Sequence, residues 1–526
     1  MSAITPQTEL RLIKCPIESD NRNQLTFSNA TAQYNYFNSL PHLEVDNFTY
    51  QRKDSVIRYP AHIDSIMTYN YVMYQNEAYT DKWFYAFISN MEYINDNMTL
   101  ITIKTDVYQT WMFDMVWKQS FIEREHVNDD TLGLHTVPEG VEMGSPKVYS
   151  TLKDNYNTDY SIITQSTVDP DTLSNVDKIH QYNGVPTPGI LCRWDSVTSV
   201  NPLGRLAYFL NRLDTEGKKD ALINMYIAPR WLLGTASDEY VQESTQVASQ
   251  MFGISRISQL DGYTPKNKKL LTYPYCYIAL SNGIGQFKTY KQERWELDNN
   301  NEMLVVMKGV ITPGCSIRAY PFGYNGEAYG QGNTDESIVI GKYPILAWSS
   351  DTYTNWLTQN GVNLGMNAIG GVTGLIGGTA LSLTGGGTMA GIGMIASSIG
   401  MISNSMKEVY QHSLVPADVN GSLNSGDVVC MTKTNRLIAY RMGITQEYAK
   451  IIDKYFDMYG YKVNTLKTPN ITGRTNWNYV KTIGANIEGD IPEDHLNEIK
   501  TMFNNGVTLW HNASTYLDYS QSNAIV

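Results

Sequence analysis

A run of about 55 residues without Asp, Glu, Lys, Arg or His, residues 352–406, most constrains how this chain can fold. The run is rich in Gly, Ile, Leu and Met, and Gly385, Gly386 and Gly387 divide it into two halves. Each half approaches the roughly 20 apolar residues that a helix needs to cross the roughly 30 Å hydrocarbon layer of a membrane. The segment could therefore enter a membrane as a hairpin.

The same run is a poor constitutive membrane anchor. Glycine costs about 1 kcal/mol in a helix interior, and Asn363 and Asn367 interrupt the apolar face. Small residues four apart nevertheless suit close contact between helices in lipid. The glycines that we assign to this role are Gly370, Gly374, Gly378, Gly387 and Gly391. The pattern favours a conditional, oligomeric membrane-inserting device; a flexible glycine-rich loop, or a buried pair of small-residue helices, would also fit it.

We predict that the large apolar side chains of the segment contact lipid. They are Ile369, Leu375, Ile376, Leu381, Met389, Ile392, Ile395, Ile399 and Ile402. Exposed together on an oligomer, such segments would form an apolar patch far above a few hundred Å², which invites aggregation. We therefore expect the segment to be hidden until it is released.

Charge and aromatic content describe the surroundings of this segment. The net charge of −12 argues against a protein that grips nucleic acid, because such proteins usually present a basic face. Only 17% of the residues are charged and 37 are Tyr, a composition that suggests subunit interfaces. The Tyr content is equally typical of β-sheets. The five cysteines are widely spaced and form no CxxC pair. We expect buried free thiols, no signal peptide in the first 16 residues, and synthesis in a reducing cytoplasm.

The sequence predicts a mainly β protein with some α-structure. Residues 83–93 and 99–107 read as a hairpin around Asn95-Asp96-Asn97, and residues 287–297 and 303–311 as a second one. Clear helical signals occur only near the end, from Thr445 to Gly460 and from Pro492 to Gly506. Our predicted division is 1–150, an N-terminal β domain; 151–262, an inserted domain; 263–350, a β domain; 351–425, the hydrophobic membrane-active loop; and 426–526, a C-terminal segment with two helices.

Signatures of catalysis and metal binding are weak. The eight His show no HExxH or other short ligand spacing, so we expect neither a metal site nor a cofactor. Residues 391–396 imitate a dinucleotide fingerprint, but the apolar glycine-rich run before them is no βαβ unit. We predict no catalytic residues, although a pair of distant carboxylates of the glycosidase type stays open.

Several long, specific blocks occur near the two ends of the chain. Those near the start are residues 33–38, 74–79, 82–87, 106–113 and 120–127. Those near the end are residues 459–464, 477–480, 489–491 and 503–511. These blocks closely resemble the tail-knob (distal tube) proteins of small short-tailed phages of Gram-positive bacteria. Because the likeness concentrates in the first and last segments, it implies that 1–150 is an N-terminal β tube domain and 426–526 a C-terminal tube segment. The likeness is slighter around residues 273–276 and is not visible to us in residues 151–262.

The resemblance implies a hexameric, largely β-structured and barrel-like tube at the end of a virion tail, through which genome DNA is ejected. It also implies that a long hydrophobic loop, here residues 352–406, plugs the tube and then inserts into the host membrane. The implied partners are further copies of the chain, collar or proximal-tube and tail-tip proteins, membrane lipid, and DNA as passing cargo. A tail-associated enzyme that cuts cell-wall polymer and a receptor-binding module are the alternatives. We further predict an acidic or neutral channel wall, because a basic wall would bind and stall DNA.

Overall fold

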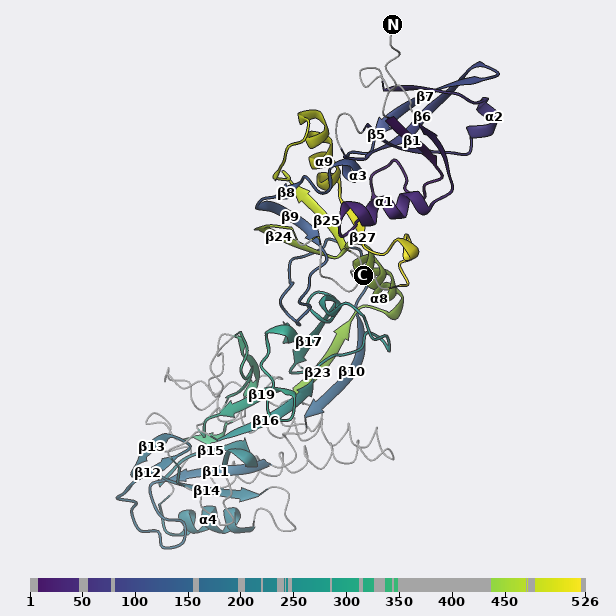
Figure 1. Cartoon of the computed structure of the whole chain (residues 1–526). Helices are drawn as coiled ribbons and strands as arrows, with labels where there is room; N and C mark the ends of the chain where they lie inside the picture. Colours follow the sequence, from purple (N-terminus) through teal and green to yellow (C-terminus); the bar gives the residue numbers. More distant parts are fainter. Residues whose placement is uncertain are drawn as a thin grey trace, which may run out of the picture. The chain divides into compact units, whose positions relative to one another are not determined.

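The computed structural model describes sixteen stretches of the chain. They are residues 8–46, 55–76, 81–154, 160–196, 204–218, 221–233, 241, 243–244, 248–283, 286–311, 316–325, 336–342, 345–348, 437–469, 471 and 478–521. These residues form two compact units (Figure 1). Unit 1 comprises Met1–Met143, Pro265–Leu270 and Gln446–Val526, and unit 2 comprises Gly144–Thr264 and Leu271–Thr445. Each unit is therefore assembled from separate parts of the sequence.

The larger sheet of unit 1 has the antiparallel order β3-β1-β5-β6-β7-β4. Its strands are β1 (Thr8–Ile13), β3 (His42–Asp46), β4 (Val56–Tyr59), β5 (Tyr71–Asn76), β6 (Phe84–Asn95) and β7 (Met98–Thr105). Successive side chains point to opposite faces, so Leu12 and Val72 enter one core while Ile13 and Tyr71 enter another. Both faces of this sheet are therefore buried at its centre.

Helices cover parts of this sheet. Helix α1 (Ala30–Ser39) starts where the Asn29 side chain accepts a hydrogen bond from the Ala32 amide, and its Phe37 ring stacks on Tyr71 at 5.4 Å. Helix α2 (Ile63–Ile66) is a single turn whose Ile66 is buried in the opposite core.

The second sheet of unit 1 has the order β2-β27-β25-β9-β24. Its strands are β2 (Asn23–Leu25), β9 (Ser120–Glu125), β24 (Tyr461–Lys467), β25 (Asn478–Ile483) and β27 (Val507–Trp510), with β8 (Val116–Trp117) and β26 (Ile487–Glu488) pairing beside it. Helices α3 (Val107–Trp111) and α9 (Glu493–Asn505) pack on one face through a shared core that includes Val480 and Phe503 (Figure 1). The first and last parts of the sequence thus complete one unit.

Unit 2 holds three four-stranded sheets of orders β10-β23-β17-β18, β14-β11-β15-β22 and β16-β19-β20-β21, besides the hairpin β12-β13. The strands are β10 (Lys147–Asp154), β11 (Tyr160–Ser166), β12 (Ile179–Tyr182), β13 (Val185–Pro188), β14 (Leu191–Ser196), β15 (Leu222–Pro229), β16 (Ser249–Ser255), β17 (Cys276–Ser281), β18 (Phe287–Tyr290), β19 (Glu302–Gly309), β20 (Ser316–Pro321), β21 (Ile338–Lys342), β22 (Ile345–Trp348) and β23 (Leu437–Gly443). Helix α4 (Gly204–Thr215) buries Leu206, Phe209 and Leu213.

Short 3₁₀ turns and one further helix complete the described elements. The turns are η2 (Arg230–Leu233), η3 (Lys268–Leu271), η4 (Gln292–Arg294) and η6 (Ala513–Thr515). Helix α8 (Gln446–Tyr459) is followed by Gly460 at φ +63°, as α9 is followed by Gly506 at φ +95°. A side chain on either glycine would clash with other atoms. A Cβ on Gly460 would meet the Glu125 carbonyl oxygen, and a Cβ on Gly506 would meet the Tyr479 hydroxyl.

The expected mainly β fold is confirmed, and so are the hairpin β6–β7 and the helices α8 and α9. The second predicted hairpin is wrong. Strand β18 pairs with β17, whereas β19 pairs with β16 and β20 in another sheet. The buried Gln292 side chain accepts from the Ile257 amide at 2.8 Å and donates to the Leu271 carbonyl, and it thereby diverts the chain into η4. The turn itself was correct, since the Asp298 amide donates to the Glu302 carbonyl at 2.9 Å.

The expectation that helices lie only near the end was also wrong, since α1 and α4 precede them. Helix α1 has a weak pattern because its polar Gln33 is buried and donates to the Gln109 carbonyl at 2.8 Å. The expected free thiols are present at Cys15, Cys192 and Cys276, all buried. The division of the sequence into five segments stays a prediction.

Candidate membrane-active and assembly elements

All predicted lipid-contacting residues and loop glycines, within residues 369–402, lie outside the described residues. The structure describes the two strands between which the uncharged run 352–406 is inserted. Strand β22 (Ile345–Trp348) precedes the run, and β23 (Leu437–Gly443) follows it. Among the helices that the structure describes, none combines the length and apolar character needed to cross a membrane.

Among the described strands, β22 has a partner along one side only. It forms the edge of its sheet and pairs with β15 at Asn224↔Trp348, Met225↔Ala347 and Tyr226↔Ile345, with a bulge between Met225 and Tyr226. A bulge leaves one residue out of the ladder and disrupts the hydrogen bonds around it. The segment before the uncharged run is therefore weakly attached.

Strand β23 is held along both sides. It pairs with β10 from Lys147↔Gly443 to Asp154↔Leu437, with a bulge between Val148 and Ser150, and with β17 from Cys276↔Gly443 to Ser281↔Ile438 without a bulge. Its Arg441 guanidinium donates to the Arg256 carbonyl at 2.8 Å, and Ile444 just beyond it donates its amide to the Tyr275 carbonyl at 2.9 Å. Strand β23 is therefore firmly attached.

A buried charge cluster lies in unit 1 around Glu139. The Glu139 carboxylate is fully buried and forms ion pairs with both Arg124 and Lys269, whose side chains are 9% and 2% exposed. It also accepts a hydrogen bond from the Lys462 amide at 2.9 Å. Burial lowers the pKa of the Lys269 ammonium, while Glu139 opposes that shift by favouring the charged form. The carboxylate therefore compensates two buried cations.

Lys269 is part of the segment Pro265–Leu270, which belongs to unit 1 although the chain on both sides of it belongs to unit 2. Asp453 of α8 binds other residues of this segment. Its carboxylate accepts from the amides of Lys266 at 2.8 Å and Asn267 at 3.0 Å. The next amide, that of Lys268, donates to Asp130 at 2.9 Å. Sequence analysis missed this cluster because its members lie far apart in the chain and form no short motif.

An exposed apolar row crosses three neighbouring strands of the second sheet of unit 1. Phe121 on β9 is paired directly with Leu466 on β24 and with Ile483 on β25. Paired residues share a face, and here they are 37%, 64% and 58% exposed. Single exposed apolar residues are ordinary, whereas adjacent ones form a candidate contact surface. Sequence analysis did not single out these residues.

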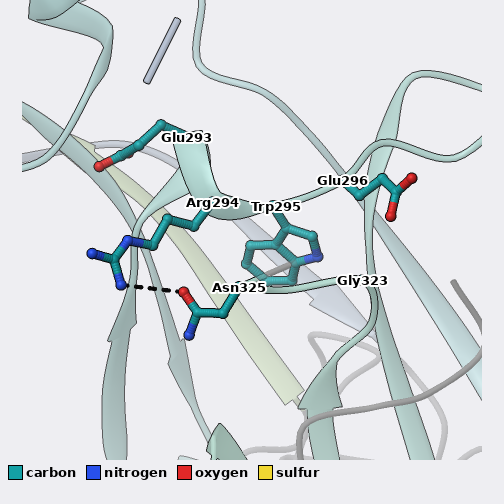
Figure 2. Close-up of a pocket in the computed structure, with 6 residues that line it drawn as sticks. All are labelled: Glu293, Arg294, Trp295, Glu296, Gly323 and Asn325. Atoms are coloured by element: carbon teal, nitrogen blue, oxygen red, sulfur yellow. Dashed lines mark hydrogen bonds between the residues drawn. The ribbon is translucent and has the colours of Figure 1, made fainter. Parts of the chain in front are cut away.

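A polar pocket of about 660 Å³ in unit 2 is lined by two carboxylates, so it is a possible place for the pair that a glycosidase needs (Figure 2). Glu293 and Glu296 line it, and their side chains point in opposite directions on either side of Trp295. Tyr273 donates its amide to both Glu293 oxygens at 3.3 Å, and burial raises the pKa of that carboxyl. Trp295 is buried, so its ring offers no open face to a sugar. This pocket lacks the two converging carboxylates of a glycosidase.

Within the part of the chain that the structure describes, no cluster of three or more His, Cys, Asp or Glu is arranged to hold a metal ion.

Comparison with known proteins identifies the family. Residues 241–524 match the model of the C-terminal domain of the tail knob protein gp9 of Bacillus phage phi29, and residues 6–118 match that of the caudoviral major tail protein N-terminus. The first match spans more than half of the 526 residues. The chain belongs to the phi29 tail knob protein family.

Relatives match this tail knob protein over nearly all of its length. The tail knob protein gp9 of phage phi29 is 26% identical over 96% of both chains, and that of Bacillus phage B103 is 24% identical over 98% of both. The structure of the bacteriophage C1 tail knob protein gp12 has the same fold, with a TM-score of 0.62 and 16% identity over 97% of this chain and 98% of that chain. The protein is therefore a structural component of the virion tail, as the resemblance predicted.

Proposed function

We propose that this tail knob protein forms, as a homo-hexamer, the wall of the conduit through which the genome leaves the virion. Residues 352–406 plug this conduit and, after release, insert into the host membrane. The observation that supports the proposal is the uncharged run itself, placed between β22 and β23 of a tail knob protein. The role is structural, with neither a catalytic residue nor a cofactor.

Charge makes the proposed channel suitable for passing DNA. A basic wall would replace the counterions of the duplex and hold it, whereas an acidic or neutral wall lets it slide. The excess of 12 negative charges per chain makes such a wall easy to build. The strand-rich regions before residue 150 and after residue 260 provide most of it. DNA is then non-specific cargo, and filter binding that is tight and falls steeply with salt would contradict this arrangement.

Contacts in the virion follow from the same proposal. The apolar row of Phe121, Leu466 and Ile483 is covered by a neighbouring copy in the ring, because water contact with adjacent apolar side chains is unfavourable. Collar or proximal-tube proteins and tail-tip proteins are the further partners in the tail.

Four measurements test the function. Electron microscopy of the purified protein is expected to show rings with a central hole, and a variant that lacks residues 352–406 is expected to form the same rings. Intact protein in which residues 352–406 have been released is expected to make liposomes leak dye. The deletion variant is expected to cause no leakage. Equal leakage with both proteins would remove the membrane role from residues 352–406.

Two further measurements address the alternative functions. Soluble fragments released from cell walls would favour an enzyme, and saturable adsorption of the isolated protein to host cells would favour a receptor-binding module.

A further inference from the structure

The two strands that flank the uncharged run differ in how they are attached to unit 2. We infer that release is one-sided: β22 detaches from β15 when residues 352–406 leave, while β23 stays in its sheet as a fixed tether. This inference rests on the proposed membrane insertion and adds the part of the fold that rearranges.

The pairing of β22 makes it the first element to open. Proteins open locally where few buried contacts and hydrogen bonds must be broken, and edge strands have partners on one side only. Three residue pairs interrupted by a bulge join β22 to β15. Pro344 precedes the strand and has no amide hydrogen with which to extend the ladder.

Strand β21 (Ile338–Lys342) sets the limit of this opening. Its Ile338 and Ile340 are 3% and 2% exposed, so detaching it would expose two buried side chains. Both backbone groups of Val339 form hydrogen bonds with side chains. Its amide donates to the Gln286 side chain at 3.0 Å, and its carbonyl accepts from the Asn282 side chain at 2.9 Å. Opening therefore ends at about residue 342.

The gain in reach is large enough to matter. Residues 343–348, once extended, add up to about 20 Å at 3.3–3.6 Å per residue, against a hydrocarbon layer of about 30 Å. The uncharged run can thus move away from unit 2 on its amino-terminal side without loss of any sheet interior.

The tether at β23 cannot open without dismantling its sheet. Leu437 and Ala439 are fully buried, and both neighbours of the strand would lose their partner. Gly443 at its end lies close against the chain before β17, since an added Cβ would lie 2.7 Å from the Tyr275 carbonyl oxygen. The run therefore stays connected to the tail through its carboxyl-terminal side.

Hydrogen exchange of the intact oligomer tests the order of opening without a membrane. Peptides that cover residues 345–348 are expected to exchange at least tenfold faster than peptides that cover residues 437–443. Equal protection of the two strands, or faster exchange in β23, would overturn the inference whatever the protein does to lipid.

Disulfide locks test the consequence for membranes. Met225→Cys with Ala347→Cys joins β22 to β15, and the matched control, Ala279→Cys with Tyr440→Cys, joins β23 to β17. We expect the oxidised β22 lock to lower dye leakage at least tenfold, reduction to restore it, and the β23 lock to have no effect.

Leakage that persists with the oxidised β22 lock, or that the β23 lock abolishes equally, would overturn the inference. If the first pair prevents folding, Asn224→Cys with Trp348→Cys replaces it. Should the unmodified protein leak no more dye than the variant without residues 352–406, the membrane function fails, and hydrogen exchange still decides the order of opening.

Discussion

Lys269 and Glu139 form an ion pair inside unit 1 although 130 residues separate them in the sequence. Arg124 pairs with the same carboxylate, so one acid compensates two cations in a place that excludes water. The pair holds the end of the segment Pro265–Leu270, which is inserted between parts of unit 2. The integrity of unit 1 therefore depends on a residue in the irregular stretch before β10.

Glu139→Gln is expected to destabilise unit 1 by about 3–5 kcal/mol, because it leaves two buried cations without their counter-charge. Urea unfolding followed by the fluorescence of unit 1 tryptophans measures the change. The control is Lys118→Met, which removes a more exposed pair with Glu488 in the same unit and is expected to cost about 0–1 kcal/mol. Equal losses in the two variants would contradict the role of the Glu139 cluster.

Asp106 is expected to make stability depend on pH. Burial raises the pKa of this carboxyl from 3.8 to about 6, against hydrogen bonds such as that from the Gln109 amide. The folded state therefore binds the proton more strongly than the unfolded state between pH 3.8 and about 6. The free energy of unfolding is expected to fall by roughly 3 kcal/mol as pH rises through this window.

Asp106→Asn tests that expectation. Asparagine keeps an oxygen that can cap α3 and carries no charge, so the pH-dependent contribution is expected to disappear. Unfolding free energies at pH 4, 5, 6 and 7 are compared with those of the unmodified protein and of Asp64→Asn, which changes an exposed carboxylate. A slope that survives in Asp106→Asn would mean that another group titrates.

Leu466→Asp is expected to prevent ring assembly by placing a charge within the apolar row. Leu466 is 64% exposed in one chain, so the change leaves the fold intact and acts only where a neighbouring copy covers the row. Mass photometry measures the assembly. Met67→Asp, at a site 65% exposed and outside the row, is the control and is expected to form normal rings. Intact rings with Leu466→Asp would exclude the row from the contact.

Local signals predicted some of these elements well. The β6–β7 hairpin and α8 were found because turn residues and Gly460 act over a few positions of sequence. The second hairpin failed because Gln292 bonds to Ile257, a partner that no local pattern indicates. The Glu139 cluster was missed for the same reason, since its ion pairs join distant segments. The apolar row becomes visible only once the register of β9, β24 and β25 is known.

Ile395→Asp is expected to weaken membrane insertion while leaving assembly unchanged. A central aspartate costs about 2.5–3.5 kcal/mol on insertion scales, which corresponds to an about 70- to 400-fold lower insertion equilibrium. Dye leakage from liposomes measures the effect, with Ile395→Leu expected to retain activity. Ile179→Asp introduces the same charge at a 73% exposed position of β12, outside residues 352–406. This variant is expected to cause as much dye leakage from liposomes as the unmodified protein. Full leakage by Ile395→Asp would place residue 395 away from the bilayer centre, whereas loss with Ile179→Asp as well would point to a general effect of added charge.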